Sequence, residues 1–350
     1  QLDAESKMEY RELGGTGTRV SQICLGTMNF GGATDESTSR RIIDEAIDGG
    51  INFIDTADVY GAGISEEIIG RALQANGRRD DVVLATKAVA AMGKGPNDRG
   101  ASRYHLTRAV EDSLRRLQTD RIDLFYLHVV DTSTPMHEIF DQLRILVQQG
   151  KILYVGTSKW PVPLIMEGLM MHEKFGLPRI VAEQPPYNLC DRTIERELVW
   201  TAMRQNIGLV TWGPLAYGIL SGMYRKGQPI PEGHRFSEAD LETNSRFTPA
   251  ALELVEELTE VAEDKGIDLP ALAHAWIQQR PGITSPIIGP RTLDHLRQAL
   301  KTAEITFTDE EMARIDEAIG RGDYVSDFYY SKAYGTLAEV INTENPTDYS

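Results

Sequence analysis

Short apolar, β-branched runs recur along the chain, and polar or glycine-containing segments separate them. The first seven runs begin about 30 residues apart, which is the length of one strand and one helix with short connections. The runs are nearly continuous in apolar residues rather than alternating, as is typical of buried parallel strands. The pattern predicts eight strands, at 20–25, 51–55, 81–87, 122–128, 152–158, 180–184, 207–212 and 285–289.

The segments between these runs show helical periodicity. Ile42 and Ala46 lie four positions apart, and Val110, Leu114 and Leu117 share one face of a second helix. Alternating strands and helices fit a closed (β/α)8 TIM barrel or an open doubly wound sheet. No GxGxxG motif follows any run, and eight evenly spaced units favour the α/β barrel.

The interval between the last two runs, 285 − 207 = 78 residues, is too long for one helix. It predicts a Gly/Pro-rich insertion after the seventh strand, at 218–233, and helices at 248–265 and 270–279. Further helices are expected at 293–303 and after Thr308, which forms a capping-box pattern with Glu311. We therefore expect a single domain over 1–350, with the barrel at about 8–319 and a C-terminal tail at 320–350.

Composition narrows the class of protein. The chain has 350 residues, 41% of them hydrophobic, and its net charge of −16 disfavours nucleic acid and anionic membranes as partners. Its two cysteines, Cys24 and Cys190, form no CxxC or Cys/His pattern, so neither a disulfide framework nor a zinc site is expected. The sequence has no signal-peptide pattern and no run of about 18 apolar residues. We expect a soluble, cytoplasmic protein.

Polar residues follow three consecutive predicted strands. Asp55, Lys87 and His128 end the second, third and fourth runs, and Tyr60 follows Asp55 by five positions. In a barrel these residues converge on the C-terminal mouth. A tyrosine hydroxyl, with an ordinary pKa of about 10, is a weak acid, and a neighbouring ammonium held by a carboxylate stabilises its phenolate. The set therefore suits proton transfer to a carbonyl oxygen, with His128 as a second donor.

The motifs GINFIDTADVYG, ATK, LRRLQTDRIDLFYLH and GKILYVGTS resemble the aldo-keto reductase superfamily, in the branch that includes potassium-channel β subunits and bacterial sugar or alcohol reductases. The resemblance runs through all eight units and implies an (α/β)8 barrel that uses NAD(P)H without a metal. It assigns Asp55, Tyr60, Lys87 and His128 to the catalytic tetrad, with Tyr60 as the general acid in reduction. A metal-dependent hydrolase would instead need an HxH-like cluster after the first strand.

The same resemblance places the cofactor. It implies that Ser158 and Gln184 bind the nicotinamide carboxamide and that Trp212 stacks on the ring. It also implies that NADPH is preferred over NADH, with Arg291 and Arg235 as candidates for the 2′-phosphate. Lys159 stands where the family usually has asparagine. The other implied cofactor residues are Gly26, Thr27, Met28, Gly213, Pro214, Leu215, Gly218, Gly289, His295 and Gln298, with backbone N–H groups of the 214–218 loop facing the pyrophosphate.

The sequence is less specific about the substrate-binding end of the site. Phe30, Trp160 and Tyr217 are expected to line an aromatic pocket for a small carbonyl or alcohol substrate. The aromatic tail at 324–334 is expected either to form one wall of that pocket or to pack on the barrel side or a second subunit in a homo-oligomer. A stretch beginning MGKGPND also resembles nucleotide-diphosphate keto-deoxysugar reductases. The alternative to an enzyme is a cofactor-sensing regulatory protein like the channel β subunits.

Overall fold

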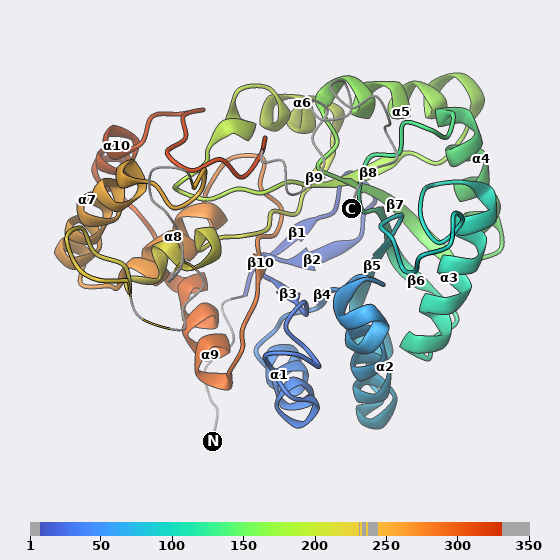
Figure 1. The fold of residues 1–350 in the computed structure, drawn as a ribbon, viewed down its shortest axis with the longest axis horizontal. Coiled ribbons are helices and arrows are strands. Elements are labelled where there is room, and N and C mark those ends of the chain that lie inside the picture. Colours follow the sequence, from blue (N-terminus) through green and yellow to red (C-terminus); the bar gives the residue numbers. More distant parts are fainter. Residues whose placement is uncertain (1–7, 231, 233–235, 237–243, 331–350) are drawn as a thin grey trace.

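The computed structural model describes residues 8–230, 232, 236 and 244–330. Eight parallel strands curl around a common axis, and helices surround them (Figure 1). The strands are β3 (Cys24–Gly26), β4 (Phe53–Asp55), β5 (Val83–Ala88), β6 (Ile122–Leu127), β7 (Ile152–Ser158), β8 (Ile180–Gln184), β9 (Gly208–Leu209) and β10 (Ile287–Ile288). Their spatial order is β10-β3-β4-β5-β6-β7-β8-β9, so each strand from β4 to β9 pairs with its predecessor in the sequence, and β10 pairs with β3.

Hydrogen bonds between the last strands bring the two ends of the sheet together. The backbone N–H of Thr284 donates to the carbonyl of Leu209 at 2.9 Å, and that of Ile287 donates to Thr211 at 2.7 Å. The sheet order and these bonds confirm the (β/α)8 barrel. β9 and β10 are shorter than predicted, although Val210 and Trp212 still donate to the carbonyls of Glu183 and Pro185, both at 3.0 Å.

Within the described residues the helices alternate with the strands from β3 to β9, two further helices lie between β9 and β10, two follow β10, and all pack outside the strands. They are α1 (Glu36–Asp48), α2 (Ile64–Asn76), α3 (Arg103–Leu117), α4 (Met136–Gln148), α5 (Val162–Phe175), α6 (Leu198–Gln205), α7 (Pro249–Lys265), α8 (Leu269–Gln278), α9 (Leu293–Lys301) and α10 (Asp309–Ala318). The predicted capping box opens α10: Glu311 N–H donates to the Thr308 hydroxyl at 3.2 Å, and Thr308 N–H donates to the Glu311 carboxylate at 2.8 Å.

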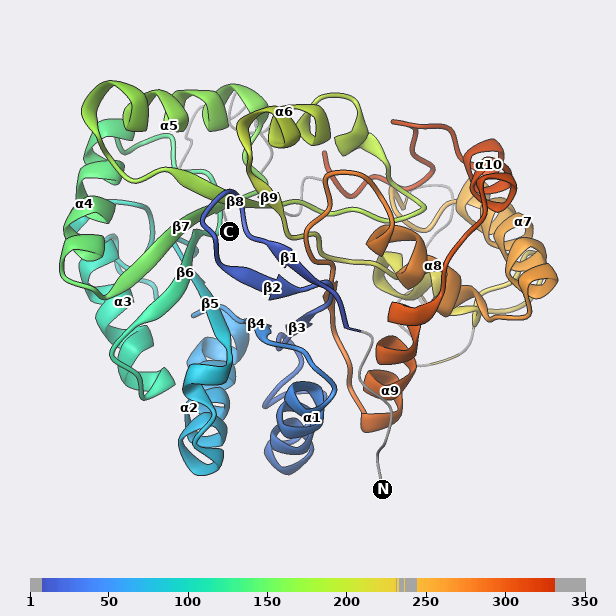
Figure 2. The same ribbon diagram turned by 180° about the vertical axis from the view of Figure 1, so that it is seen from behind.

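The prediction of one strand at 20–25 is wrong, because the chain divides there into two elements. Residues 19–21 form β2 (Arg19–Ser21), which pairs antiparallel with β1 (Tyr10–Glu12), and the barrel strand begins only at Cys24. This hairpin crosses the end of the barrel from which β3 starts (Figure 2). Leu13 and Val20 are fully buried in the inner core, where they close that end with apolar side chains.

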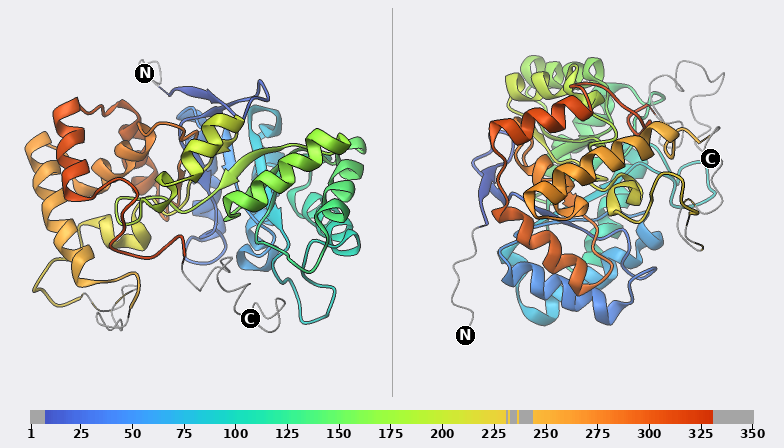
Figure 3. Two further views of the ribbon diagram at one scale, coloured as in Figure 1. Left: turned by 90° about the horizontal axis from the view of Figure 1, so that it is seen from above. Right: turned by 90° about the vertical axis from the view of Figure 1, so that its left-hand side faces the viewer.

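The long interval between β9 and β10 holds the predicted insertion and two helices. A 3₁₀ turn, η4 (Ala216–Ser221), opens it, and α7 and α8 follow at nearly the predicted positions. Together with α10, these helices form a group on one side of the barrel (Figure 3). After α10 the tail returns, and the N–H groups of Val325 and Asp327 donate to the carbonyls of Cys190 and Ser245, at 2.9 and 2.8 Å.

Candidate active site

The four predicted catalytic residues meet at the C-terminal ends of three adjacent strands. Asp55 ends β4, Lys87 lies next to the last residue of β5, and His128 directly follows β6. Parallel pairing aligns these positions, and His128 N–H donates to the carbonyl of Ala88 at 2.9 Å. Tyr60 starts the short 3₁₀ turn η1 (Tyr60–Gly63) after β4. Regular strand register therefore places three of the four residues at the site, and a loop places the fourth.

Lys87 is the centre of the site. Its side chain is fully buried, and its ammonium group donates to the Asp55 carboxylate at 2.5 Å, to the Thr56 carbonyl at 2.7 Å and to the Tyr60 hydroxyl at 3.2 Å. An ammonium has three N–H donors, so these contacts use all of them. Because Lys87 donates to the Tyr60 oxygen, the hydrogen of that hydroxyl is directed elsewhere.

Electrostatics keep the ammonium charged. Burial alone would lower the pKa of Lys87, but the Asp55 carboxylate and the Tyr60 hydroxyl outweigh burial and hold that pKa above its ordinary value. A permanent positive charge beside a phenol favours its ionised form. The arrangement can therefore assist Tyr60 in releasing a proton.

Backbone hydrogen bonds to β5 hold the loop that follows β4 and leads to Tyr60. Thr56 N–H donates to the carbonyl of Ala85 at 2.9 Å, and Asp58 N–H donates to that of Lys87 at 3.1 Å. The chain then turns sharply through three left-handed residues, Gly61 to Gly63, with φ of 59°, 54° and 98°. Glycine accepts this conformation at two of the three positions without steric cost. The turn ends where α2 begins, so Tyr60 is held between a strand extension and a helix start.

His128 lies beside Tyr60, with ring centroids 6.0 Å apart in an edge-on arrangement. Burial, together with the positive charges of Lys87 and Lys159, lowers the pKa of His128 to about 3. The imidazole is therefore neutral across the physiological range. A neutral imidazole has one N–H donor, which suits a hydrogen bond to a carbonyl oxygen rather than proton release.

Two predicted nicotinamide-binding residues lie next to this centre. Gln184 donates its side-chain N–H to the second carboxylate oxygen of Asp55 at 2.9 Å, and the Ser158 hydroxyl donates to the backbone carbonyl of Gln184 at 3.0 Å. Both side chains are buried at the mouth, on adjacent strands β7 and β8. The structure thus brings an amide and a hydroxyl next to Asp55 and Lys87, and these groups match the donor and acceptor atoms of a carboxamide.

Trp212 and the loop after β9 lie over the same end. Trp212 is half-buried, and its ring centroid is 6.1 Å from that of Tyr217. The loop runs through four left-handed residues, Gly213, Ala216, Tyr217 and Gly218. Gly218 N–H already donates to the carbonyl of Leu215 at 2.8 Å, so that amide closes the turn. Pro214 lacks an N–H group, so the backbone donors expected in this loop belong to its other residues.

The loop after β3 adds a third segment. The hydroxyl and N–H of Thr27 both donate to the carbonyl of Asp55, at 3.0 and 3.1 Å, while Met28 is half exposed. Gly26 lies against β10, where a Cβ would stand 2.9 Å from the Ile288 carbonyl oxygen. Only glycine fits this position without movement of a neighbouring backbone.

The predicted adenine end forms a separate surface beside β10 and α9. Arg291 is exposed between them, and its carbonyl accepts the Thr34 hydroxyl at 3.2 Å. His295 and Gln298 are exposed three positions apart on α9 and so share one face of it. The carbonyl of Gly289 accepts the side-chain N–H of Asn29 at 3.3 Å. Arg235 lies outside the described residues.

The three predicted substrate residues are placed differently from one another. Phe30 and Trp160 are buried, with 1% and 2% of their surfaces exposed, and belong to the main hydrophobic core. Tyr217 is half-buried and contacts Phe328 of the tail, with ring centroids 5.4 Å apart. Arg246, which the sequence did not suggest, stacks its guanidinium 5.2 Å from the Tyr217 ring.

The described part of the tail is anchored at the mouth. The Asp191 carboxylate, in the loop after β8, accepts the N–H groups of Phe328 and Tyr329, both at 2.8 Å. Phe328 is fully buried as a result. Tyr334 and the rest of the predicted aromatic segment lie outside the described residues.

Sequence reasoning also missed two buried acids. Asp58 precedes Tyr60 by two residues, and burial and the nearby Glu66 raise its pKa to about 8. Glu183 is fully buried beside Ser158, and burial raises its pKa to about 8 as well. Glu183 interrupts the otherwise apolar start of the strand at 180–184. A carboxylate in a run predicted to be buried is a feature of the sequence that could have identified this residue as a candidate.

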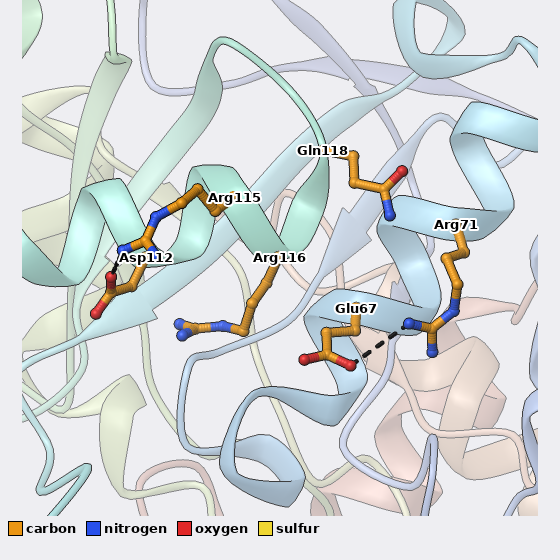
Figure 4. Close-up of a pocket in the computed structure, with 6 residues that line it drawn as sticks. All are labelled: Glu67, Arg71, Asp112, Arg115, Arg116 and Gln118. Carbon is orange, nitrogen blue, oxygen red and sulfur yellow. Dashed lines mark hydrogen bonds and ion pairs between the residues drawn. The ribbon is translucent and has the colours of Figure 1, made fainter.

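A separate pocket of about 460 Å³ lies on the outside of the barrel between α2 and α3 (Figure 4). Its charged side chains are already paired: Arg71 with Glu67, and Arg115 with Asp112. None of its lining residues belongs to the predicted site. The described residues hold no group of three or more side chains suited to a metal ion, and in that part of the chain no helix has the length and apolar character needed to cross a membrane.

Comparison with known proteins agrees with this geometry. The model of the aldo/keto reductase family matches residues 22–320. The chain is 42% identical over 318 residues to "Uncharacterized oxidoreductase YrpG" of Bacillus subtilis, covering 88% of this chain and 94% of that protein. The chain therefore belongs to the aldo/keto reductase family, whose class of reaction is the reduction of carbonyl groups.

Two plant proteins are also similar along nearly their whole length. Both are named "Probable voltage-gated potassium channel subunit beta". The one from Oryza sativa subsp. japonica is 34% identical over 319 residues, 89% of this chain and 97% of that protein. The one from Arabidopsis thaliana is 35% identical over 303 residues, 85% of this chain and 92% of that protein.

Proposed function

We propose that this protein reduces an aldehyde or ketone with hydride from NADPH, and that Tyr60 donates the proton. The observation that carries the proposal is the ammonium of Lys87, which is held by Asp55 and donates to the Tyr60 hydroxyl at 3.2 Å. This contact orients the hydroxyl and stabilises the phenolate left after proton transfer. In the reverse direction the phenolate accepts the proton of an alcohol.

The residues around this centre fit a nicotinamide cofactor. Bound NADPH supplies the hydride, and Ser158 and Gln184 offer groups for its carboxamide. Trp212 offers an aromatic face to the ring. The neutral imidazole of His128 gives the substrate oxygen a second hydrogen bond, which stabilises the charge that develops there. Asp55 holds the Lys87 ammonium in place, and Lys87 acts on the reacting group through its contact with the Tyr60 hydroxyl.

Turnover over a panel of aldehydes and ketones, followed as loss of NADPH absorbance, tests the proposal. Tyr60→Phe should abolish turnover but still bind NADPH, because it removes only the reacting hydroxyl. Tyr10→Phe is a matched control, since Tyr10 lies on β1 of the hairpin and its hydroxyl donates to the carbonyl of Gly50, which follows α1, away from the site. Unchanged turnover in Tyr60→Phe would refute the assigned proton donor.

A second candidate is a cofactor-sensing regulatory protein, which the similarity to the two plant channel subunits supports. The complete tetrad, His128 included, favours the enzyme. Tight NADPH binding without turnover on any carbonyl of the panel would favour the sensor. Among substrates, the aromatic contacts of Tyr217 and Phe328 suit a small ring compound or sugar, nucleotide-linked keto-deoxyhexoses included.

A further inference from the structure

Glu183 is a buried acid next to the proposed cofactor site, and the proposed reaction gives it no role. It lies on β8 opposite Thr157 of β7, one position before the pair formed by Ser158 and Gln184. Successive residues of a strand face opposite sides. Gln184 reaches inward to Asp55, whereas the Glu183 side chain contacts the start of the segment that follows β7.

Several donors converge on the Glu183 carboxylate. The N–H of Trp160 donates to one oxygen at 3.1 Å, and the Thr157 hydroxyl donates to the other. The N–H and the ammonium of Lys159 also favour its ionised form. A carboxylate accepts all of these hydrogen bonds at once, whereas a neutral side chain of the same shape presents a donor of its own to one of them.

The turn that these contacts hold is conformationally costly. Lys159 has a φ of 56°, in the left-handed region that side chains disfavour. Strained backbone of this kind persists only where its surroundings fix it, and it is concentrated at functional positions. Here the fixing group is the Glu183 carboxylate, which contacts residues on both sides of Lys159 in the sequence.

We propose that Glu183 is a positioning residue for the nicotinamide end of the cofactor. By holding the left-handed turn at Lys159, it sets the orientation of Ser158 and Lys159 without touching the cofactor. β8 thus organises both halves of the site with neighbouring residues, since Gln184 holds Asp55 of the tetrad and Glu183 holds the turn. The inference rests on the proposed function, because it assumes that NADPH binds at Ser158.

The ionisation of Glu183 gives this role a distinctive signature. The charged or titratable groups that face it are Lys159, Tyr126 and Tyr329. The pKa values of both tyrosines are raised, mainly by burial, so they stay neutral near pH 8. Burial raises the pKa of Glu183 itself to about 8. Its carboxylate therefore forms between about pH 7 and 9, and NADPH should bind more tightly as it forms.

The test compares NADPH dissociation constants, measured by fluorescence, for wild type and Glu183→Gln. At pH 9 the variant should bind NADPH about fivefold or more weakly, because Glu183 is then ionised and an amide in its place leaves one buried donor unpaired. Its kcat at saturating NADPH should change much less, because the tetrad is intact. The wild-type dissociation constant should fall from pH 7 to 9, and that of the variant should stay flatter. Asp58 titrates in the same range in both proteins, so their difference belongs to Glu183.

Glu66→Gln is the matched control. Glu66 is equally buried and also accepts a threonine hydroxyl, that of Thr86 at 2.6 Å, but it lies on α2 away from the turn. This control should lower thermal stability and leave NADPH affinity unchanged. An equal loss of affinity in both variants would show a merely structural role and overturn the proposal.

The remaining outcomes distinguish failure of the proposed function from failure of the role of Glu183. If wild type does not bind NADPH, the proposed function fails and this inference fails with it. If wild type and Glu183→Gln bind NADPH equally well with parallel pH curves, only the role of Glu183 is refuted. If Glu183→Gln does not fold, Thr157→Val replaces it and should weaken NADPH binding in the same direction. Unchanged affinity in that variant would overturn the proposal.

Discussion

Replacing Lys87 with methionine tests how the buried charges of the site depend on one another. Lys87→Met keeps most of the side-chain volume, but among the residues that the structure describes it leaves the Asp55 carboxylate, 2% exposed, with only the Gln184 amide as a partner. Removing one member of a buried ion pair costs about 3–5 kcal/mol. With an unfolding entropy of about 2.1 cal/mol/K per residue, 350 residues give about 0.7 kcal/mol/K. We therefore expect the melting temperature to fall by about 4–7 °C.

The double variant Asp55→Asn/Lys87→Met isolates the charge effect. An asparagine at position 55 is neutral and can still accept the Gln184 N–H, so most of the lost stability should return. Thermal melts of wild type, the single variant and the double variant measure this, and turnover should be absent from both variants. Burial raises the pKa of Asp55, so the deficit of Lys87→Met should be larger at pH 8 than at pH 5, where the acid can be protonated. A double variant no more stable than Lys87→Met at pH 8 would refute the reasoning.

Three further predictions follow from named contacts. Burial raises the pKa of Asp58 from 3.8 to about 8, so the fold favours its protonated form and wild type should lose stability between about pH 4 and 8. Asp58→Asn should remove on the order of a few kcal/mol of that loss. Parallel curves of melting temperature against pH for the two proteins would contradict this. Arg291→Ala should weaken NADPH far more than NADH in equilibrium binding, and equal losses would show that Arg291 does not read the 2′-phosphate. Phe328→Ala should raise the KM of the carbonyl substrate and leave NADPH affinity unchanged, because the Phe328 ring packs on Tyr217. Steady-state kinetics with each substrate varied would measure both, and an unchanged carbonyl KM with weaker NADPH binding would contradict this.

Local sequence patterns were sufficient for much of the barrel and for predicting that Asp55, Lys87 and His128 meet at one end of it. Five of the six strands from β4 to β9 lie within their predicted ranges, and β5 runs one residue past its range, because continuous apolar runs are a local property of the chain. Asp55, Lys87 and His128 could be placed together because the C-terminal ends of neighbouring parallel strands lie at one face of the barrel. The capping box of Thr308 was predictable for the same reason, since both partners lie within four residues.

Other features depend on contacts between distant segments. The apolar residues at 20–25 have the composition of one strand, but the hairpin splits from the barrel strand because Val20 and Leu13 fill the inner core below the mouth. The hydrophobic pattern cannot distinguish one strand at 20–25 from a hairpin strand followed by a barrel strand, since both arrangements bury the same side chains. The anchoring of Phe328 by Asp191, 137 positions away, is equally invisible in the sequence.

The sequence alone therefore determined which strands form, which polar groups close them and to which family the motifs are similar. The tertiary structure decided how those groups contact one another: the three contacts of the Lys87 ammonium, the neutral state of His128 and the hydrogen bonds of Glu183 on both sides of Lys159. The physical reason is that strand formation depends on neighbouring residues. Hydrogen bonds and pKa values instead depend on distance and burial, which only the folded chain sets.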